Sequence, residues 1–460
     1  MNWSFLPIVA DANAGGATPP AGGAPAGVET AGVETAGVET AGVELGEAIG
    51  TGLTRLGESW NTSREQGGFY VEAFFNDFLG VQIQESLFSA GGMLVACGAV
   101  FGFLQLFALW AVWAERKISA HIQCRLGPME VGPHGLLQTL ADGIKLTVKE
   151  DIIPRLADKP LFIIAPIIVF AGTLVRFVPI PFGEHLVASD MDLGLFFIAA
   201  VGSIEVIGVI MAGWASNNKW SLLGTIRTAT QMVSYEVPIG LSFVTVIISF
   251  GTFSLVDIVN MQGGFLTSLD GETTAGWFYH WTVFRNPFIL GTVIVYLIAS
   301  LAECKRAPFD LPEAESELVS GFHTEYSGIR FALFFLAEYG AMYIVSAVAV
   351  CLFFGGWWTG IPALDLLGVP GVGEAGDPLL LTIGFAIKAG ALVSKALILV
   401  MIQMWVRWTF PRIRLDQMMY VCWKVLLPIG IVCLLGTCIW ELLGQGGTFF
   451  GFGTTVQLVK

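Results

Sequence analysis

Between residues 86 and 114 the chain carries no formal charge. A helix needs about 20 apolar residues to cross the ~30 Å hydrocarbon core of a bilayer, so this stretch predicts a membrane-spanning helix. The composition agrees, because only 13% of the residues are charged, whereas soluble domains average about 25%. Further apolar stretches bring the prediction to an all-α polytopic membrane protein with about eight transmembrane helices: 161–181, 193–214, 237–256, 287–302, 331–354, 380–406 and 425–441.

Lys and Arg residues are unevenly shared between the two sides of this predicted bundle. One set of connections holds 16 of the 23 basic residues: 115–160, 215–232, 303–330 and 407–424. The opposite set, counted together with both termini, holds only five: 176–192, 251–286 and 355–379. Because basic loops remain in the cytoplasm, the first set is predicted to be cytoplasmic and both termini are predicted to lie outside.

The first 85 residues differ from the rest of the chain. Residues 26–45 repeat the pentapeptide AGVET three times and end on AGVEL. Gly, Ala and Thr with a Glu in every fifth position cannot bury a core, which predicts disorder in this part. We therefore divide the chain into an acidic, partly disordered extension (1–85), a membrane domain (86–445) and a C-terminal tail (446–460).

Several classes of site have no support in the sequence. The seven cysteines never form C-x-x-C and most lie in apolar runs, so no iron–sulfur cluster or other metal site is expected in this chain. No G-x-G-x-x-G motif opens a strand–helix unit, which argues against a nucleotide site. The net charge is −14 without a basic stripe, so nucleic acid is not an expected partner. If redox chemistry occurs, the electrons come from another polypeptide.

The connection from residue 115 to residue 160 is too long and too patterned to be a passive link. Its apolar residues recur on one helical face: Leu136, Leu137, Leu140, Ile144 and Val148. This predicts an amphipathic helix in the membrane interface, or else an ordinary helix packed on the spans. Two Gly-Pro turns at 127–128 and 132–133 follow Arg116, Lys117 and Arg125, and predict a rigid mouth or docking surface.

Ionisable residues recur inside the predicted spans, where a charge at the helix centre costs about 2.5–3.5 kcal/mol. Four spans contribute one acid each: Glu205, Glu236, Glu303 and Glu338. The seventh span holds Lys388 and Lys395, which lie on nearly the same helical face. One such acid could be a packing accident satisfied by a neighbouring lysine, but the whole set predicts a proton-conducting polar axis.

The densest group of acids follows the fifth span, in the segment AECKRAPFDLPEAESELVSGFHTEY (302–326). It contains six acids beside a membrane boundary: Glu303, Asp310, Glu313, Glu315, Glu317 and Glu325. Acids in the first turn of a helix that begins at Pro312 complement the helix dipole, which explains one or two of them. Close carboxylates titrate as a coupled set, so the whole group predicts a switch that responds to a nearby redox change.

These segments resemble the H-type subunit of bacterial NADH–quinone oxidoreductase, the counterpart of subunit 1 of mitochondrial respiratory complex I. The resemblance covers about residues 86–445. Besides the 302–326 segment, the matching stretches are AERK (114–117), RLGPMEVGPHGLLQTLADGIKLTVKE (125–150), AGWASNNKWSLLGTIR (212–227), SYE (234–236), FALFFLAEY (331–339) and WVRWTFPRIRLDQMMYVCWKVLLP (405–428).

The resemblance implies an eight-helix subunit of the bacterial cytoplasmic membrane, at the joint between the hydrophilic redox arm and the membrane arm. It would form much of a chamber for quinone, the substrate, and would bind no cofactor covalently. Iron–sulfur centres and flavin would lie on partner subunits. The expected partners are the hydrophilic quinone-module subunits and the antiporter-like or small membrane subunits.

The resemblance also implies roles for individual residues. The quinone chamber would involve Arg116, Lys117, Arg125 and Asp142. The redox-coupled acidic loop would involve Glu303, Asp310, Glu313, Glu315 and Glu317. The proton path would involve Glu236, Glu325 and Glu338, and we predict that Glu205 and Lys395 also belong to it.

The sequence departs from this family at a few places. Glu205-Val206-Ile207-Gly208 stands where the family often has Gly-Val-Tyr-Gly, so we interpret Glu205 as a relocated acid. Lys388 is additional, whereas Lys395 occupies the family's lysine position. The first 85 residues have no counterpart, and the connection 251–286 is expanded.

Three other classes of protein stay open at this point. A membrane subunit of a hydrogenase-type complex would couple electron transfer to ion movement without quinone. A stand-alone secondary transporter is a second option, although inverted repeats typical of such folds are not seen. A plain scaffold is the third, and the intramembrane charges argue against it.

Overall fold

The computed structural model describes residues 85–183, 186–263, 266–267, 273–274, 277–311, 318–365 and 378–443. The AGVET repeats and the predicted C-terminal tail lie outside the described residues. So do three members of the predicted acidic loop: Glu313, Glu315 and Glu317. The divisions at residues 85 and 446 therefore stay predictions.

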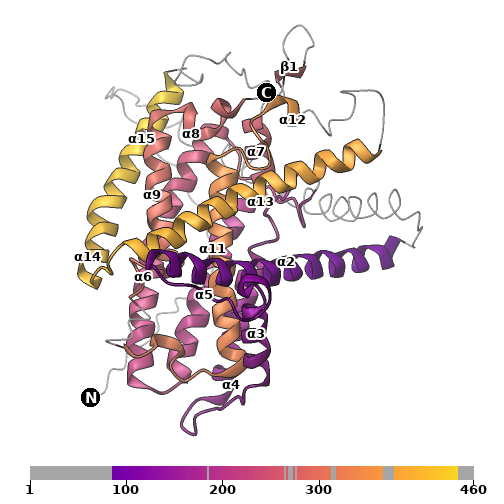
Figure 1. The fold of residues 1–460 in the computed structure, drawn as a ribbon. Helices are drawn as coiled ribbons and strands as arrows, with labels where there is room; N and C mark the ends of the chain where they lie inside the picture. Colours follow the sequence, from indigo (N-terminus) through magenta and orange to yellow (C-terminus); the bar gives the residue numbers. More distant parts are fainter. Residues whose placement is uncertain are drawn as a thin grey trace, which may run out of the picture. The chain divides into compact units, whose positions relative to one another are not determined.

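The regular secondary structure of the described residues is almost entirely helical, which confirms the all-α prediction (Figure 1). The exception is one antiparallel pair of two-residue strands, β1 (Leu266–Thr267) and β2 (Thr273–Thr274). The helices are α2 (Glu85–Ile122), η1 (Pro133–Gly135), α3 (Gln138–Val148), α4 (Lys159–Val175), α5 (Gly194–Ala215), α6 (Lys219–Phe250), α7 (Leu255–Gly263), η2 (Phe278–His280), α8 (Thr282–Arg285), α9 (Pro287–Glu303), η3 (Gly321–His323), α11 (Gly328–Phe353), α12 (Pro362–Asp365), α13 (Pro378–Thr409), α14 (Leu415–Tyr420), the π-helical η4 (Val421–Leu426) and α15 (Leu427–Leu442).

A helix lies in each of the eight stretches that were predicted to span the membrane. Six helical segments are long and apolar enough to do so by length and composition: those of α2, α5, α6, α11, α13 and the continuous run from α14 to α15. The other two, α4 and α9, have 17 residues each. The membrane fold is therefore confirmed, while the number of eight spans remains a prediction.

Two predicted connections are partly helical. Helix α2 continues through the ERK triplet to Ile122, so Arg116 and Lys117 lie on the helix itself. Helix α6 begins at Lys219, because the Asn218 side chain accepts a hydrogen bond from the Trp220 backbone N–H at 3.0 Å and so caps its first turn. At 1.5 Å per residue, α6 is about 48 Å long and exceeds the thickness of a bilayer core. The predicted connection 215–232 is therefore helical from Lys219 onward, and the helix starts well before the predicted span at 237.

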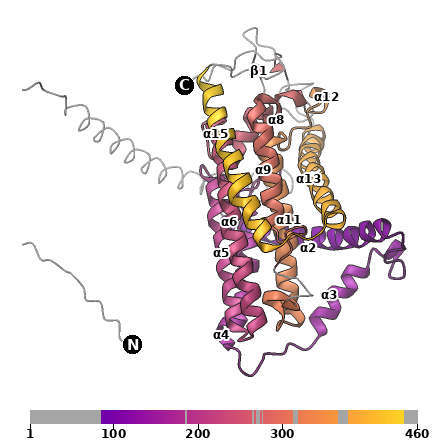
Figure 2. The ribbon, with the colours of Figure 1, turned by 90° about the vertical axis from the view of Figure 1, so that its left-hand side faces the viewer.

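The first two helices lie differently from the others. Helix α2 runs crosswise to α5, α6 and α9 in both views, while α3 contacts α2 and α11 (Figures 1 and 2). The predicted helix in the 115–160 connection is confirmed as α3. Its five predicted apolar residues, two of which directly precede the helix, are between 46% and 80% exposed. The helix thus packs by its other side and leaves an apolar face uncovered in this chain.

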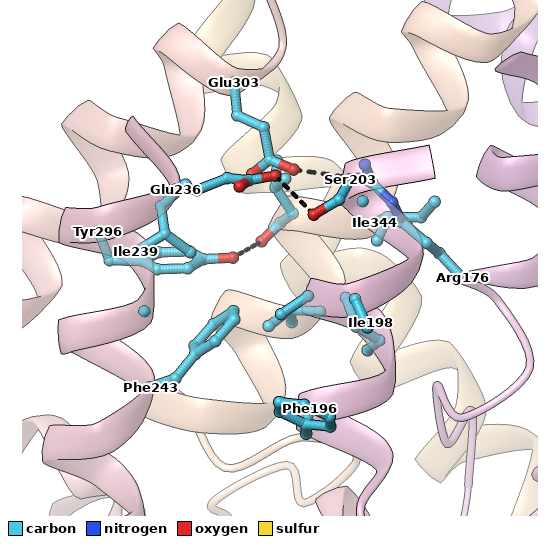
Figure 3. Close-up of a pocket in the computed structure, with 16 residues that line it drawn as sticks. Arg176, Phe196, Ile198, Ser203, Glu236, Ile239, Phe243, Tyr296, Glu303 and Ile344 are labelled. Carbon is cyan, nitrogen blue, oxygen red and sulfur yellow. Dashed lines mark hydrogen bonds and ion pairs between the residues drawn. The ribbon is translucent and has the colours of Figure 1, made fainter. Parts of the chain in front are cut away.

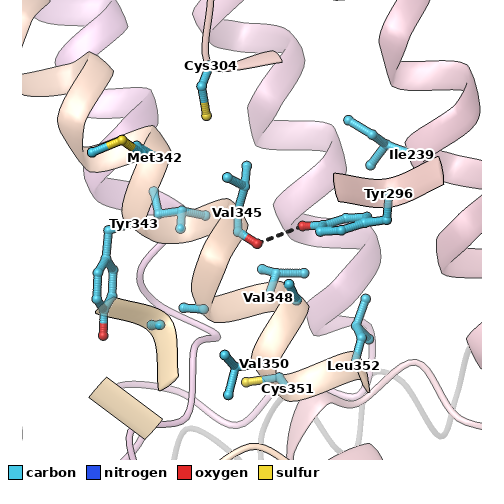
Figure 4. Packing of buried hydrophobic residues seen from close by; sticks show 14 of the residues in the cluster. Ile239, Tyr296, Cys304, Met342, Tyr343, Val345, Val348, Val350, Cys351 and Leu352 are labelled. Carbon is cyan, nitrogen blue, oxygen red and sulfur yellow. Dashed lines mark hydrogen bonds between the residues drawn. The ribbon is translucent and has the colours of Figure 1, made fainter. Parts of the chain in front are cut away.

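Helix α11 forms the centre of the main hydrophobic core. Every residue from Tyr339 to Phe353 is buried, and the helix contacts α4, α9, α13 and other elements. Figure 4 shows side chains of α11 facing Ile239 of α6 and Tyr296 of α9. The Tyr296 hydroxyl donates to the Val345 carbonyl at 2.9 Å. Helix α11 therefore contacts several of the helices that carry ionisable residues, among them α2, α9 and α13.

Candidate functional site: two buried ion clusters and two cavities

Arg176, directly after α4, joins two carboxylates in the interior. Its Nη2 lies 3.1 Å from Glu205 Oε2 on α5, and its Nη1 lies 3.0 Å from Glu303 Oε1 at the end of α9. The arginine side chain is only 2% exposed. The sequence analysis counted Arg176 with the charges of the connection 176–192 and predicted neither its burial nor its two partners. Arg176 interrupts the apolar run FAGTLVRFVPIPF (170–182), and this pattern could have indicated a buried arginine.

Lys305 completes a group that we call the first ion cluster: Arg176, Glu205, Glu303 and Lys305. The Lys305 ammonium lies 3.2 Å from Glu205 Oε1 and is 6% exposed. Two cations and two carboxylates therefore face one another in a region of low dielectric constant. A buried pair of this kind persists only when its charges are matched, because desolvation costs several kcal/mol per ion.

A cavity of about 300 Å³ lies beside the first ion cluster (Figure 3). Glu303 and Glu236 meet at one end of it, where Glu236 accepts a hydrogen bond from Ser203 Oγ at 3.3 Å. The rest of the wall is mostly apolar and includes Phe243 and Ile344. Liquid water occupies about 30 Å³ per molecule, so the cavity has room for a short chain of waters that leads to these two carboxylates.

A second ion cluster consists of Glu115, Arg306, Glu338 and Arg407. Glu115 Oε2 lies 2.8 Å from Arg306 Nη1, and its other oxygen pairs with Arg407. Arg306 Nε lies 2.8 Å from Glu338. The Tyr339 hydroxyl also donates to Glu115, at 2.5 Å. This cluster joins α2, α11, α13 and the loop after α9, and it too has balanced charges.

A smaller cavity of about 100 Å³ touches both clusters. Glu205 and Lys305 of the first cluster line it together with Glu338 and Arg407 of the second. His323 lies on its wall, where burial, together with the nearby Lys305 ammonium, lowers the pKa of the imidazole to about 4. The histidine is therefore neutral at pH 7.

The predicted acidic loop is anchored at several described points. Asp310 Oδ2 lies 3.0 Å from Arg412, and Glu325 accepts a hydrogen bond from Asn218 at 2.6 Å. Gln231 of α6 donates to the Ala302 and Phe309 carbonyls, at 2.8 Å each. Sequence reasoning missed Gln231, since nothing marks a glutamine as a loop anchor before the fold is known.

Two of the four residues predicted for a quinone chamber are paired. Arg116 Nη1 lies 2.6 Å from Asp142 Oδ2, which joins α2 to α3. Burial raises the pKa of Asp142, but the Arg116 hydrogen bond and charge outweigh it and leave this pKa below its ordinary value. Lys117 contacts Met129 Sδ at 3.1 Å, and Arg125 Nε contacts the Gln123 side chain at 2.6 Å. The structure thus brings Arg116 and Asp142 together but joins neither to Lys117 or Arg125.

Lys395 lies against the end of α11. Its ammonium donates to the carbonyls of Phe354, Gly356 and Trp358 at 2.7, 3.2 and 2.5 Å. No ion pair joins it to a carboxylate of the described residues. Its predicted place in the proton path stays a prediction. Lys388 is buried two turns earlier on α13, with its ammonium 4.9 Å from the centre of the Trp358 ring.

The described residues contain no group of three or more His, Cys, Asp or Glu side chains arranged to hold a metal ion. The chemistry that they support is the binding and transfer of protons by carboxylates, cations and enclosed water.

Comparison with known sequences extends over nearly all of this helical region. The sequence profile described as NADH dehydrogenase matches residues 95–438. The H-type subunit of NADH-quinone oxidoreductase from Chlorobaculum parvum is 45% identical over 352 residues, which cover 76% of this chain and 93% of the relative. An H-type subunit of the same enzyme from Cytophaga hutchinsonii is 45% identical over 362 residues, or 74% and 97% of the two chains. The H-type subunit from Anaeromyxobacter dehalogenans is 43% identical over 353 residues, or 76% and 81%. The matched region contains both ion clusters and both cavities.

Proposed function

The chain belongs to the NADH dehydrogenase family of membrane subunits of respiratory complex I, and from this premise we propose that it forms a quinone chamber and couples quinone reduction to proton translocation. Its partners in this proposal are hydrophilic subunits that carry flavin and iron–sulfur centres, and further membrane subunits. The chain itself supplies no redox centre. It would lie in the bacterial cytoplasmic membrane with both termini outside.

The proposed quinone side lies around the end of α2 and around α3. The Arg116–Asp142 pair offers a polar contact for a quinone head group, and Lys117 and Arg125 lie on the same connection. The uncovered apolar face of α3, which includes Leu140 and Ile144, suits an isoprenoid tail or the lipid from which it arrives.

The observation that carries the proton-coupling proposal is the sequence of carboxylates along the two cavities. Glu236 and Glu303 share the larger cavity, Glu303 contacts Arg176 of the first ion cluster, and the smaller cavity links that cluster to Glu338. Glu303 and Glu338 are each paired with an arginine, and the strength of such a pair changes when the charge of a neighbouring group changes. Reducing a quinone consumes two electrons and two protons, which creates such a change.

The energies are compatible with this proposal. Moving one charge against 100 mV costs about 2.3 kcal/mol. A shift of one pKa unit is worth 1.36 kcal/mol, so shifts of roughly one to two units at a carboxylate suffice. In our proposal, the acidic loop passes the change on. Asp310 and Glu325 are its described members, and Glu313, Glu315 and Glu317 are predicted ones.

The test replaces Glu303 or Glu236 by glutamine in the native complex. We expect Glu303→Gln and Glu236→Gln to lower the number of protons translocated per NADH oxidised, measured with a pH-sensitive dye in inverted membrane vesicles. Glu441→Gln is the matched control, because Glu441 also lies on an apolar helix but its only ion-pair partner among the described residues is Arg285, at 3.7 Å. Full quinone reduction with full proton translocation in both cavity variants would contradict the proposal.

A further inference from the structure

The two carboxylates of the first ion cluster differ in how fully their oxygens are occupied. Glu205 is 3% exposed, and each of its oxygens contacts a different cation: Oε2 contacts Arg176 at 3.1 Å and Oε1 contacts Lys305 at 3.2 Å. A carboxylate that carries protons must present an oxygen to a proton donor. Glu205 instead has the surroundings of a fixed anion.

Glu303 has the opposite arrangement. Only its Oε1 contacts a cation among the described residues, namely Arg176 at 3.0 Å, and the side chain is 16% exposed. The carboxylate lies on the wall of the larger cavity, beside Glu236 (Figure 3). Water in the larger cavity can therefore reach Glu303. Glu205 does not line this cavity but the smaller one, which Lys305, the partner of its Oε1, lines with it.

The Arg176 guanidinium lies between these two acids. Its Nη2 points to Glu205 and its Nη1 to Glu303, a use of both arms that a lysine ammonium cannot reproduce with the same geometry. Helix α5 carries Gly202 where the guanidinium passes, and a Cβ there would lie 3.0 Å from Nη2. The backbone is thus shaped around this arginine.

We propose that Arg176 is a positioning residue that holds Glu303 at the wall of the larger cavity, and that Glu205 is its fixed counter-ion instead of a proton carrier. This inference rests on the proposed function, since it concerns the same carboxylates. It revises the role predicted for Glu205 and assigns a role to Arg176, for which the sequence predicted none.

The charge balance of the cluster makes the proposal testable by reciprocal substitution. Arg176 and Lys305 oppose Glu205 and Glu303, so the native cluster is neutral. Arg176→Leu leaves one excess negative charge, and Glu205→Gln leaves one excess positive charge. The double variant Glu205→Gln/Lys305→Met removes one charge of each sign and restores neutrality, while Arg176 keeps its contact with Glu303.

The experiment measures NADH–quinone activity and protons translocated per NADH in vesicles that contain the assembled complex. Charged residues in contact couple strongly, so we expect Arg176→Leu and Glu205→Gln each to lower the rate of NADH-driven proton translocation about tenfold. The double variant is expected to return to within about threefold of the native rate of proton translocation. Arg176→Lys keeps the charge but loses one arm, and we expect an intermediate proton ratio. Activities are normalised to the amount of assembled complex.

Two results would overturn the proposal. If the double variant translocates no more protons than Glu205→Gln, then Glu205 is itself a carrier. If Arg176→Leu leaves the proton ratio unchanged, then Arg176 does not position Glu303. Should the leucine variant fail to assemble, Arg176→Lys decides in its place, and a native proton ratio in it counts against the proposal. Failure of the proposed function is recognised separately, because Glu303→Gln would then leave the proton ratio of otherwise native vesicles unchanged.

Discussion

Glu115→Gln is expected to destabilise the whole helical domain through the second ion cluster. In the native chain Arg306 and Arg407 face Glu115 and Glu338, and the four charges balance. The glutamine leaves one excess positive charge. It also replaces the charged Glu115 oxygen that accepts a hydrogen bond from the Tyr339 hydroxyl by a neutral amide atom.

The magnitude follows from the burial of the partners. Removing one member of a buried ion pair costs about 3–5 kcal/mol. Arg306 is 2% exposed, whereas Arg407 is 28% exposed and partly screened by its surroundings, so we take the lower end, about 3 kcal/mol. Proteins unfold with about 2.1 cal/mol/K of entropy per residue, so for a domain of about 350 residues this loss corresponds to about 4 °C.

The assay is the temperature of half-inactivation of NADH–quinone activity in membranes, with Glu441→Gln as the control for loss of a helical glutamate. The double variant Glu115→Gln/Arg407→Gln removes one charge of each sign and is expected to recover at least half of the loss. An inactivation temperature for Glu115→Gln close to the native value, at equal amounts of assembled complex, would refute the reasoning from charge balance.

Three further predictions follow from other parts of the fold. Gly213→Ala is expected to impair assembly of the complex, because an added Cβ would lie 1.6 Å from Thr225 Oγ1. The control Gly98→Ala, where an added Cβ would have nothing within 4 Å, should assemble normally, and equal amounts of both variants on immunoblots of membranes would contradict this prediction. Lys395→Met removes the ammonium that donates to three carbonyls and is expected to lower the free energy of unfolding by at least about 1–3 kcal/mol. The measurement is the inactivation temperature, which should fall, and an unchanged temperature would contradict the prediction. Burial and Lys305 lower the pKa of His323 to about 4, so between about pH 6.5 and pH 4 the unfolded chain binds more protons than the folded chain, and the stability of the fold falls as the pH drops through this range. His323→Gln should make this fall less steep in a series of inactivation measurements at decreasing pH, and an unchanged slope would count against the prediction.

Helix positions were largely predictable from the sequence. Apolar runs without charge form helices in a bilayer because unpaired backbone groups are too costly there, so stretches such as 287–302 and 331–354 gave helices close to the predicted bounds. The start of α6 was missed because Lys219 and Arg227 suggested a basic connection, whereas the Asn218 cap begins the helix before them.

Ion partners were much less predictable. Glu205, Glu303 and Glu338 were found because acids are rare in apolar runs, but their partners come from residues far away in the chain. Lys305 and Arg306 were counted as cytoplasmic anchoring charges, yet both are buried and paired. A count of basic residues cannot separate charges that orient a chain from charges that neutralise buried acids, since both appear as Lys and Arg beside a span.

The complete burial of α11 between Tyr339 and Phe353 changes what its apolar sequence means. Hydropathy marks this helix as a candidate for lipid contact, but here the neighbouring helices take the place of acyl chains. Because this part of α11 is surrounded by protein side chains, its packing depends on the volume of each residue and not on the thickness of the bilayer. Changes in lipid composition would reach Glu338 and Tyr339 only by moving the helices that surround them.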